Sequence, residues 1–453
     1  MRTLRIPGFR ALYMALAVAG CSGPNGSTPE DFTSSAQACH EANQQRFAVF
    51  SDAHLYDTTL GTEGAAFQAY LASDRKTLVQ SEPALQVVVA RIIEEHPRFL
   101  LVPGDLTKDG EYADHVLFAR YMKRIESAGI GVYVIPGNHD VMNPDAVRYT
   151  ANGTEPVPNV NEREFAHIYR EFGYGEALDR DTDSLSYLTE PTAGVWLLAI
   201  DSTIHRENTP KTGPITGGRL SDTTLTWVLD KLAQARRHGK HVIAMMHHGL
   251  VEHYAGETLL FPDYVIENHE ALSKQLADAG MPVVFTGHFH ANDVTAAHWD
   301  NGSSLFDVET GSLVTAPNPY RFVDYFPREQ KMVITTEHVT SIPGMPGFAA
   351  WSAKFLDDGL KGLVTNELTA SGLADATTAQ AIAPVVAEAL EVHYAGDEPP
   401  PDAATKQIAN ILESSASPAG QAWGYSLISL HTDLAPADND VVLDLSSGDT
   451  TAP

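Results

Sequence analysis

Short apolar runs rich in β-branched and aromatic residues alternate with longer amphipathic stretches from about residue 46 onward. This alternation is typical of an α/β fold, in which helices cover a largely parallel sheet. Six runs are predicted as strands: Phe47–Phe50, Phe99–Val102, Val132–Ile135, Trp196–Ile200, Val242–Met246 and Val283–Phe285. Helices are predicted at Ala84–Glu95, at Tyr112–Ser127, and between an N-cap at Ser221 and a stop near Gly239.

Metal-ligating residue types follow five of these six runs. The candidates are Asp52, His54, Asp105, Asn138, His247, His288 and His290. Ligands of α/β proteins bind beyond the carboxyl ends of the strands, so these side chains are expected to converge. Gly104, Gly137 and Gly287 lie among them and permit sharp turns.

The spacing and chemistry of these residues indicate a pair of metal ions. Asp52 and His54 are two residues apart, as are His288 and His290, so in extended backbone each pair projects from one face. Imidazole nitrogen combined with carboxylate oxygen suits Mn, Fe, Zn or Co, whereas an all-oxygen set suits Mg or Ca. Seven ligands are too many for one tetrahedral ion with an open position. Most of these motifs alone are more often a turn or a cap, and the His288–His290 pair alone is about equally often a metal site or not. Their joint occurrence predicts a site for two divalent or trivalent ions.

The ordered set of motifs resembles the calcineurin-like metallophosphoesterase superfamily, whose pattern runs Asp-x-His, Gly-Asp, Gly-Asn-His-Asp/Glu, His and Gly-His-x-His. The resemblance spans about residues 51–290 and implies a four-layer α/β/β/α sandwich. It implies that one ion is held by Asp52, His54 and His290, that the other is held by Asn138, His247 and His288, and that Asp105 bridges them.

The same resemblance implies a hydrolase for a small phosphoester. A metal-activated hydroxide would attack phosphorus, His139 would assist the leaving group, and Asp140 would orient His139. Purple acid phosphatases carry tyrosine three residues after the bridging aspartate, where this chain has Lys108. The run Gly104–Glu111 instead resembles the cyclic-nucleotide and glycerophosphodiester phosphodiesterase branch, although Gly249 replaces the proline usual after the paired histidines. Phosphodiesters are therefore expected more than phosphomonoesters.

Four further residues near the motifs are expected to have structural roles rather than catalytic ones. His248 is expected to support a ligand rather than to touch substrate. His253 and Tyr254 are candidates to line the pocket, but a position on a surface loop is the preferred interpretation. Arg321 is not expected to contact phosphate.

The charge balance argues against nucleic acid as a partner. The 453 residues contain 30 Lys and Arg against 58 Asp and Glu, a formal net charge of −28. Such a chain repels bulk phosphate backbones, but bound cations can still reverse the sign locally and attract a small phosphoester.

The N-terminus resembles a bacterial lipoprotein export signal. Residues 1–21 have a basic start, a short apolar stretch and the sequence Val18-Ala19-Gly20-Cys21. This predicts an extracytoplasmic protein anchored to a membrane through lipidated Cys21, with residues 22–45 as a flexible tether. Cleavage to a free soluble protein is the alternative.

The expected phosphoesterase domain covers residues 46–325, and a mostly helical region is expected over 326–453. Helical patterns occur near Ala349–Leu363, Ala379–Val392 and Ala403–Leu412, and the acidic tail beyond Leu434 lacks a clear pattern. A second hypothesis for the whole chain is a surface-tethered binding protein with a structural metal site and no turnover. The sequence leaves the oligomeric state open.

Overall fold

The computed structural model describes residues 44–453. The expected export signal, Cys21 and nearly all of the expected tether lie outside the described residues. Within residues 44–453, no helix combines the length and apolar composition that crossing a bilayer requires.

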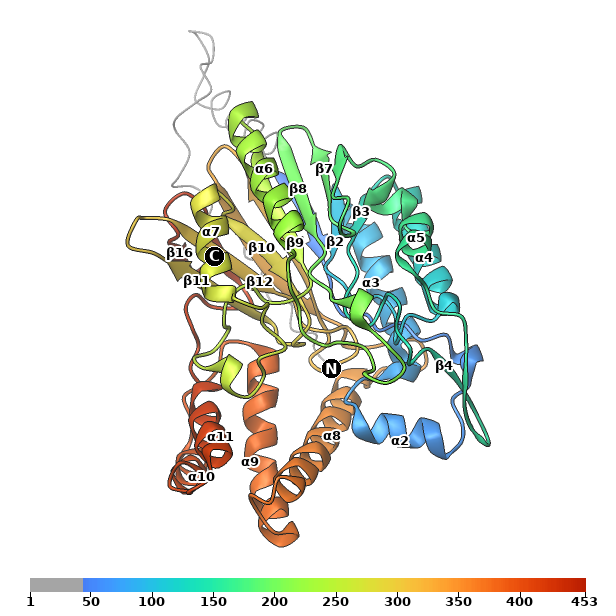
Figure 1. The fold of residues 1–453 in the computed structure, drawn as a ribbon, viewed down its shortest axis with the longest axis vertical. Coiled ribbons are helices and arrows are strands. Elements are labelled where there is room, and N and C mark those ends of the chain that lie inside the picture. Colours follow the sequence, from blue (N-terminus) through green and yellow to red (C-terminus); the bar gives the residue numbers. More distant parts are fainter. Residues whose placement is uncertain (1–43) are drawn as a thin grey trace, which may run out of the picture.

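Two mixed seven-stranded sheets form the centre of the molecule (Figure 1). In the first sheet β1 is parallel to β2 and antiparallel to β13. Its strands, in spatial order, are β16 (Thr450–Thr451), β15 (Val441–Asp444), β14 (Lys331–His338), β13 (Pro319–Phe326), β1 (Gln45–Val49), β2 (Phe99–Val102) and β3 (Gly131–Val134).

The second sheet has a parallel centre in which β9 pairs with β8 and β10, and β10 also pairs with β12. Its strands, in spatial order, are β11 (Asp293–His298), β12 (Ser304–Glu309), β10 (Val283–Thr286), β9 (His241–Met246), β8 (Val195–Ile200), β7 (Tyr187–Thr192) and β6 (Asp179–Arg180). A separate hairpin is formed by β4 (Val147–Thr150) and β5 (Gly153–Pro156). All six strands predicted from the sequence are present.

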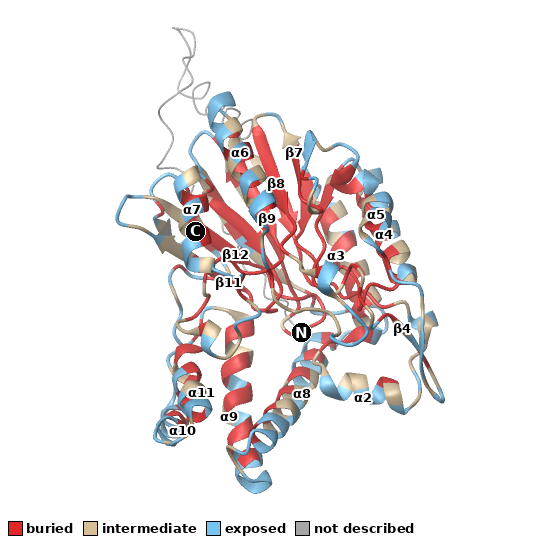
Figure 2. Ribbon diagram, in the orientation of Figure 1, coloured by how far each residue is buried: buried red, intermediate tan, exposed pale blue. Residues whose placement is uncertain are grey.

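The two sheets face each other across one apolar core, and helices cover their outer faces (Figure 2). Phe47 of β1 and Phe285 of β10 meet edge to face with ring centroids 5.4 Å apart. Along β9, Ile243 and Met245 join this inner core, whereas Val242 and Ala244 pack in a second cluster with the covering helices. Strands buried on both faces explain why these runs are continuously apolar. The α/β/β/α layering is confirmed.

Helices α3 (Ser81–Glu95), α4 (Tyr112–Ser127) and α5 (Glu162–Ile168) cover the first sheet, and α6 (Asp222–His238) and α7 (His269–Ala279) cover the second. The ends of α6 are those predicted from the sequence. The Ser221 side chain accepts a hydrogen bond from the backbone N–H of Thr224, and Gly239 ends the helix with φ 62°.

Four helices form an appendage at one end of the sandwich (Figure 1). They are α8 (Phe348–Ala370), α9 (Ala376–Ala395), α10 (Ala403–Glu413) and α11 (Pro418–Ser429). Their shared core includes Phe289 and Tyr254 of the phosphoesterase region, so the appendage is packed onto it. The short helix α2 (Ala65–Ser73) lies next to α8.

The C-terminal region is less purely helical than expected. Strand β13 crosses the expected boundary at residue 325, and β14 follows it in the same sheet. The acidic tail then returns and adds β15 to β14, pairing Val441 with Ile334 and Leu443 with Met332. Three apolar residues in an acidic tail give too short a pattern to predict this strand.

Candidate metal centre

Loops that follow β1, β2, β3, β9 and β10 bring all seven predicted ligands together at one edge of the two sheets. Five of the seven have positive φ: Asp52 50°, His54 36°, Asp105 48°, His288 81° and His290 74°. A non-glycine residue in this region costs about 1–3 kcal/mol, and such costs concentrate at functional sites. The chain therefore holds these side chains in place against local backbone preference.

Two glycines allow the ligand loops to approach one another. A Cβ on Gly137 would lie 2.1 Å from Asp105 Oδ1, and one on Gly287 would lie 2.1 Å from Ser51 Oγ. Both distances are far inside van der Waals contact, so any side chain there would displace the loops that carry ligands.

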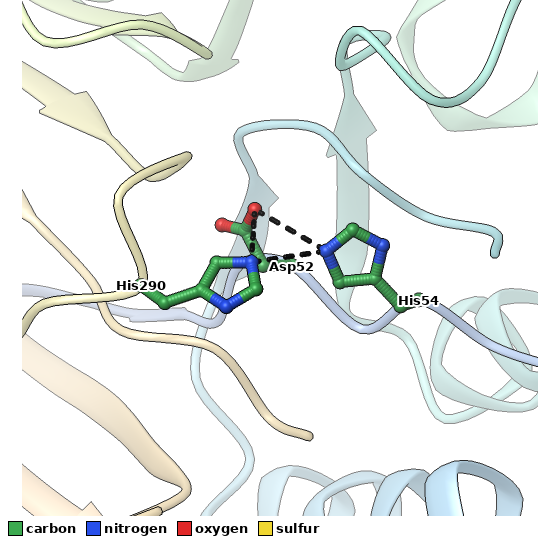
Figure 3. Close-up of side chains that lie close together, drawn as sticks. All are labelled: Asp52, His54 and His290. Carbon is green, nitrogen blue, oxygen red and sulfur yellow. Dashed lines mark hydrogen bonds and ion pairs between the residues drawn. The ribbon is translucent and has the colours of Figure 1, made fainter. Parts of the chain in front are cut away.

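The first ligand group consists of Asp52, His54 and His290 (Figure 3). The two Nε2 atoms of His54 and His290 lie 3.1 Å apart. Asp52 Oδ1 is 3.8 Å from His54 Nε2 and 3.6 Å from His290 Nε2. These three atoms point toward one another and are spaced as ligands of one ion are.

The second ligand group consists of Asn138, His247 and His288 with Asp105. His247 Nε2 is 3.0 Å from Asn138 Oδ1 and 3.4 Å from Asp105 Oδ2. The same Asp105 oxygen lies 3.5 Å from His54 Nε2 in the first group. Asp105 thus stands between the two groups, where a bridging ligand would be.

Hydrogen bonds from behind fix the direction of the ligand side chains. His247 Nδ1 donates to the carbonyl of Pro103 at 2.9 Å, which turns Nε2 toward Asp105. His290 Nδ1 lies 2.9 Å from Thr315 Oγ1. His288 Nε2 donates to the carbonyl of Asp263 at 3.2 Å.

Burial sets the charges of these groups. It lowers the pKa of His54, His288 and His290 well below 6.5, which leaves neutral imidazoles with free lone pairs. Burial opposes the charge of Asp105, but the surrounding imidazoles, His247 first, hold its pKa well below 3.8. Burial also opposes protonation of His247, but Asp105 outweighs it and raises the His247 pKa to about 9. A cation entering the second group therefore replaces a proton.

The residues fit a pair of transition-metal ions. Asp52 Oδ2 accepts the backbone N–H of His288 at 3.0 Å, whereas Asp52 Oδ1 is fully buried without a hydrogen-bond partner. A buried unpartnered carboxylate oxygen is costly unless a cation takes that place. Because it faces two imidazole nitrogens, the donor set matches the chemistry predicted from the sequence.

His139 lies beside the centre, but Asp109 orients it rather than Asp140. The His139 Nδ1 atom is 2.8 Å from Asp109 Oδ1. The expectation for Asp140 is corrected because its carboxylate is fully used elsewhere. It accepts the backbone N–H groups of Gly137, Leu106 and Thr107 and the Thr107 hydroxyl at 2.8–3.1 Å. Asp140 therefore shapes the loops that carry Asp105 and Asn138.

Lys76, which sequence reasoning missed, places an ammonium group at the centre. Its Nζ lies 3.4 Å from His139 Nε2 and 3.3 Å from Asp74. Lys76 follows α2, away from every strand end, so no motif or spacing marks it. The site is otherwise closed: His139 exposes 19% of its side chain, whereas the seven metal-ligand candidates are buried. Approach to the centre is therefore from the side of His139 and Lys76.

The remaining candidates have structural contacts. His248 lies behind His288 with ring centroids 4.4 Å apart and is held by Ser202 and the carbonyl of Thr216, as expected of a support. The surface-loop expectation for His253 and Tyr254 is wrong, because both are buried. Tyr254 packs in the core of the appendage, and His253 contacts carboxylates of the second sheet. Arg321 is buried and donates to the carbonyls of Glu309 and Asp438.

One known protein family matches the region that carries this geometry. A sequence model described as calcineurin-like phosphoesterase matches residues 45–292. No curated protein sequence matches the chain. Among solved structures, a dimetal phosphatase from Danio rerio is similar, with 15% identity, a TM-score of 0.44, and coverage of 65% of this chain and 96% of that one.

A purple acid phosphatase from yellow lupin (Lupinus luteus) seeds is also similar, with 14% identity and a TM-score of 0.40. That match covers 65% of this chain and 51% of the lupin chain, so this chain matches about half of the lupin protein. The family match extends over more than half of the present chain and contains every ligand described above. The protein belongs to the calcineurin-like phosphoesterase family.

Proposed function

We propose that the protein hydrolyses phosphodiesters in preference to phosphomonoesters at a two-metal centre. Family membership supports metal-dependent phosphoester hydrolysis with two divalent ions. The observation that carries the two-metal part of the proposal is the position of Asp105 Oδ2, within 3.5 Å of an imidazole nitrogen from each ligand group. When bound, the two ions would neutralise phosphoryl oxygens and lower the pKa of a water molecule toward neutrality.

The protein's own residues supply the remaining steps. Lys76 Nζ is placed to bind a non-bridging phosphoryl oxygen, and its charge would offset the negative charge that develops there. The water molecule first loses a proton to solvent. As the resulting hydroxide oxygen bonds to phosphorus, the bond from phosphorus to the leaving alcohol oxygen breaks, and His139 Nε2 gives its proton to the alcohol oxygen. Asp109, on the other ring nitrogen, fixes the tautomer and supports the positive imidazolium before transfer.

The diester preference is supported by the run Gly104–Glu111 and by Lys108 within it. Lys108 occupies the position at which purple acid phosphatases have tyrosine. It is buried, and its ammonium contacts Asp109 and is 3.2 Å from Glu111 Oε1. Lys108 thus supports the residue that orients His139.

Initial rates on bis-p-nitrophenyl phosphate and p-nitrophenyl phosphate test the proposal. Chelated protein is reloaded with Mn, Fe, Zn or Co before each assay. We expect kcat/KM to be at least ~10-fold higher for the diester. Equal rates would contradict the diester preference alone. Absence of turnover with either ester, together with retained phosphate binding, would favour the tethered binding protein.

We also propose that the chain is exported and anchored to a membrane through lipidated Cys21. The proposal is supported by the basic start, the apolar stretch and the Val18–Cys21 sequence. Labelled palmitate should enter the native protein and not a Cys21→Ser variant, and the variant should leave the membrane fraction. An unlabelled native protein in the soluble fraction would contradict it.

A further inference from the structure

A second group of buried ionisable residues lies where the appendage meets the phosphoesterase sandwich. We call it the junction cluster. Its members are His253, Glu257, Asp293, Asp307, Glu309, His393 and Glu398, and none exposes more than 8% of its surface. Asp293 begins β11, whereas His393 lies on α9 and Glu398 follows that helix. The cluster therefore joins two parts of the chain that are far apart in sequence.

One imidazole in the cluster already neutralises part of its negative charge. His253 Nδ1 is 2.7 Å from Asp293 Oδ1, and Nε2 is 3.5 Å from Asp307 Oδ2. Burial disfavours the charged ring, but these carboxylates, Asp293 first, raise the pKa of His253 well above 6.5. Both ring nitrogens of His253 thus face carboxylates, so His253 is not placed as a ligand of a further cation.

The remaining charges do not balance. Five carboxyl groups in the cluster face two imidazoles, with the Arg321 guanidinium nearby. Protons can neutralise two of the five, because burial raises the pKa of Glu257 to about 7 and that of Glu309 well above 4.5. Asp307 accepts the backbone N–H groups of Leu250 and Val251. Asp293 Oδ1 is likewise paired with His253. The carboxylate oxygen of the cluster that has no hydrogen-bond partner is Glu398 Oε2.

The carboxylates of Asp293 and Glu398 converge on His393. His393 Nδ1 is 2.7 Å from Glu398 Oε1 and 3.8 Å from Asp293 Oδ2, and the three ligand atoms lie within 4.8 Å of one another. Glu398 Oε2 is buried without a hydrogen-bond partner, as is His393 Nε2. An unpartnered oxygen on a carboxylate whose side chain is 2% exposed is costly, and a cation would relieve that cost.

We propose that Asp293, His393 and Glu398 form a third metal site, separate from the two-metal centre. One imidazole nitrogen and two carboxylates suit Zn or Mn, with a fourth position for water. The ion would fasten the appendage, through α9, to β11 of the sandwich. No step of phosphoester hydrolysis requires it.

The third site would also steady the loop that carries two ligands of the catalytic centre. Phe289 lies between His288 and His290, and its ring packs on His393 and Tyr394 with centroids 5.3 and 6.1 Å away. Asp293 follows His290 by three residues. A cation on Asp293 and His393 would therefore hold both ends of this short segment against the appendage.

Metal content tests the proposal independently of turnover. Chelated protein is reloaded with Zn or Mn, desalted, and its bound metal is measured by elemental analysis. Wild-type protein should hold three ions per chain, whereas His393→Gln and Glu398→Gln should hold two. Glu391→Gln is the matched control, because Glu391 lies on the same helix outside the cluster and should leave the content at three. Circular dichroism checks that each variant is folded.

Anomalous diffraction from Zn-loaded crystals gives a second readout that needs no variant. A peak between Asp293, His393 and Glu398 would support the site. Two ions per chain in the wild type, with no peak at the junction, would overturn it. A loss of phosphoesterase activity would bear on the proposed function and leave this test unaffected.

Discussion

Asp109 Oδ1 lies 2.8 Å from the Nδ1 atom of His139, on the side of the ring opposite the approach to the metal centre. Asp109 is in turn contacted by the buried ammonium of Lys108. These successive side-chain contacts, from Lys108 to Asp109 to His139, thus fix the tautomer of His139 and the direction in which its Nε2 atom points.

Replacing Asp109 with asparagine should slow turnover without removing the metal ions. We expect kcat to fall by about 10- to 100-fold, because the imidazolium loses its carboxylate partner. The loss should be larger for alkyl esters than for p-nitrophenyl esters, since poor leaving groups depend more on proton donation. Asp145→Asn, an exposed neighbour, is the control. An equal loss for both kinds of ester would argue against this role.

Replacing Asp105 with asparagine should disrupt both ligand groups at once. Its Oδ2 atom is 3.5 Å from His54 Nε2 and 3.4 Å from His247 Nε2. We expect turnover to fall by at least ~100-fold and the content of bound metal at this centre to drop. Elemental analysis and initial rates measure the two effects. Full metal content with unharmed turnover would contradict the bridging assignment.

Replacing Lys76 with methionine keeps the length of the side chain and removes its charge. The Lys76 ammonium lies 3.4 Å from His139 Nε2 at the accessible side of the centre. We expect kcat/KM for phosphoesters to fall by about 10- to 100-fold, because a positive group at the phosphoryl oxygens is lost. Lys274→Met, which removes an exposed ammonium, serves as the control. Unchanged kinetics in Lys76→Met would exclude a substrate contact.

The sequence predicts the strands and the seven ligands because they share one local signal. A strand buried on both faces is a continuous apolar run, and the loop that follows it carries Asp, Asn or His. Asp109 and Lys76 lack such a signal. Asp109 stands in a turn near Asp105, and its contact with His139 depends on the packing of two loops.

Contacts between the sandwich and the appendage also could not be predicted from the sequence. Asp293 and His393 are 100 residues apart, and each alone resembles an ordinary polar residue at the end of an element. Strand β15 becomes stable only because β14 offers an edge for Val441 and Leu443. Such features depend on tertiary contacts that no local pattern records.

The ion pair between Glu162 and His205 should make stability depend on pH away from the metal centre. Hydrogen bonds from His205 and Arg206 lower the pKa of Glu162 to about 2. Burial alone would lower the pKa of His205, but the hydrogen bond to Glu162 outweighs burial and raises that pKa above 6.5. The Glu162 contribution is complete above pH 4.5 and is lost as pH falls through about 2. The His205 contribution is complete below pH 6.5 and is lost as pH rises through its folded pKa.

Glu162→Gln should therefore lower the free energy of unfolding by about 1–2 kcal/mol near pH 5.5, and by less at pH 9. Urea unfolding of both proteins in metal-free buffer measures this. Glu155→Gln, which breaks the exposed pair with Arg148, should cost under ~0.5 kcal/mol at either pH. An equal effect of Glu162→Gln at both pH values would show that the pair acts by packing and not by charge.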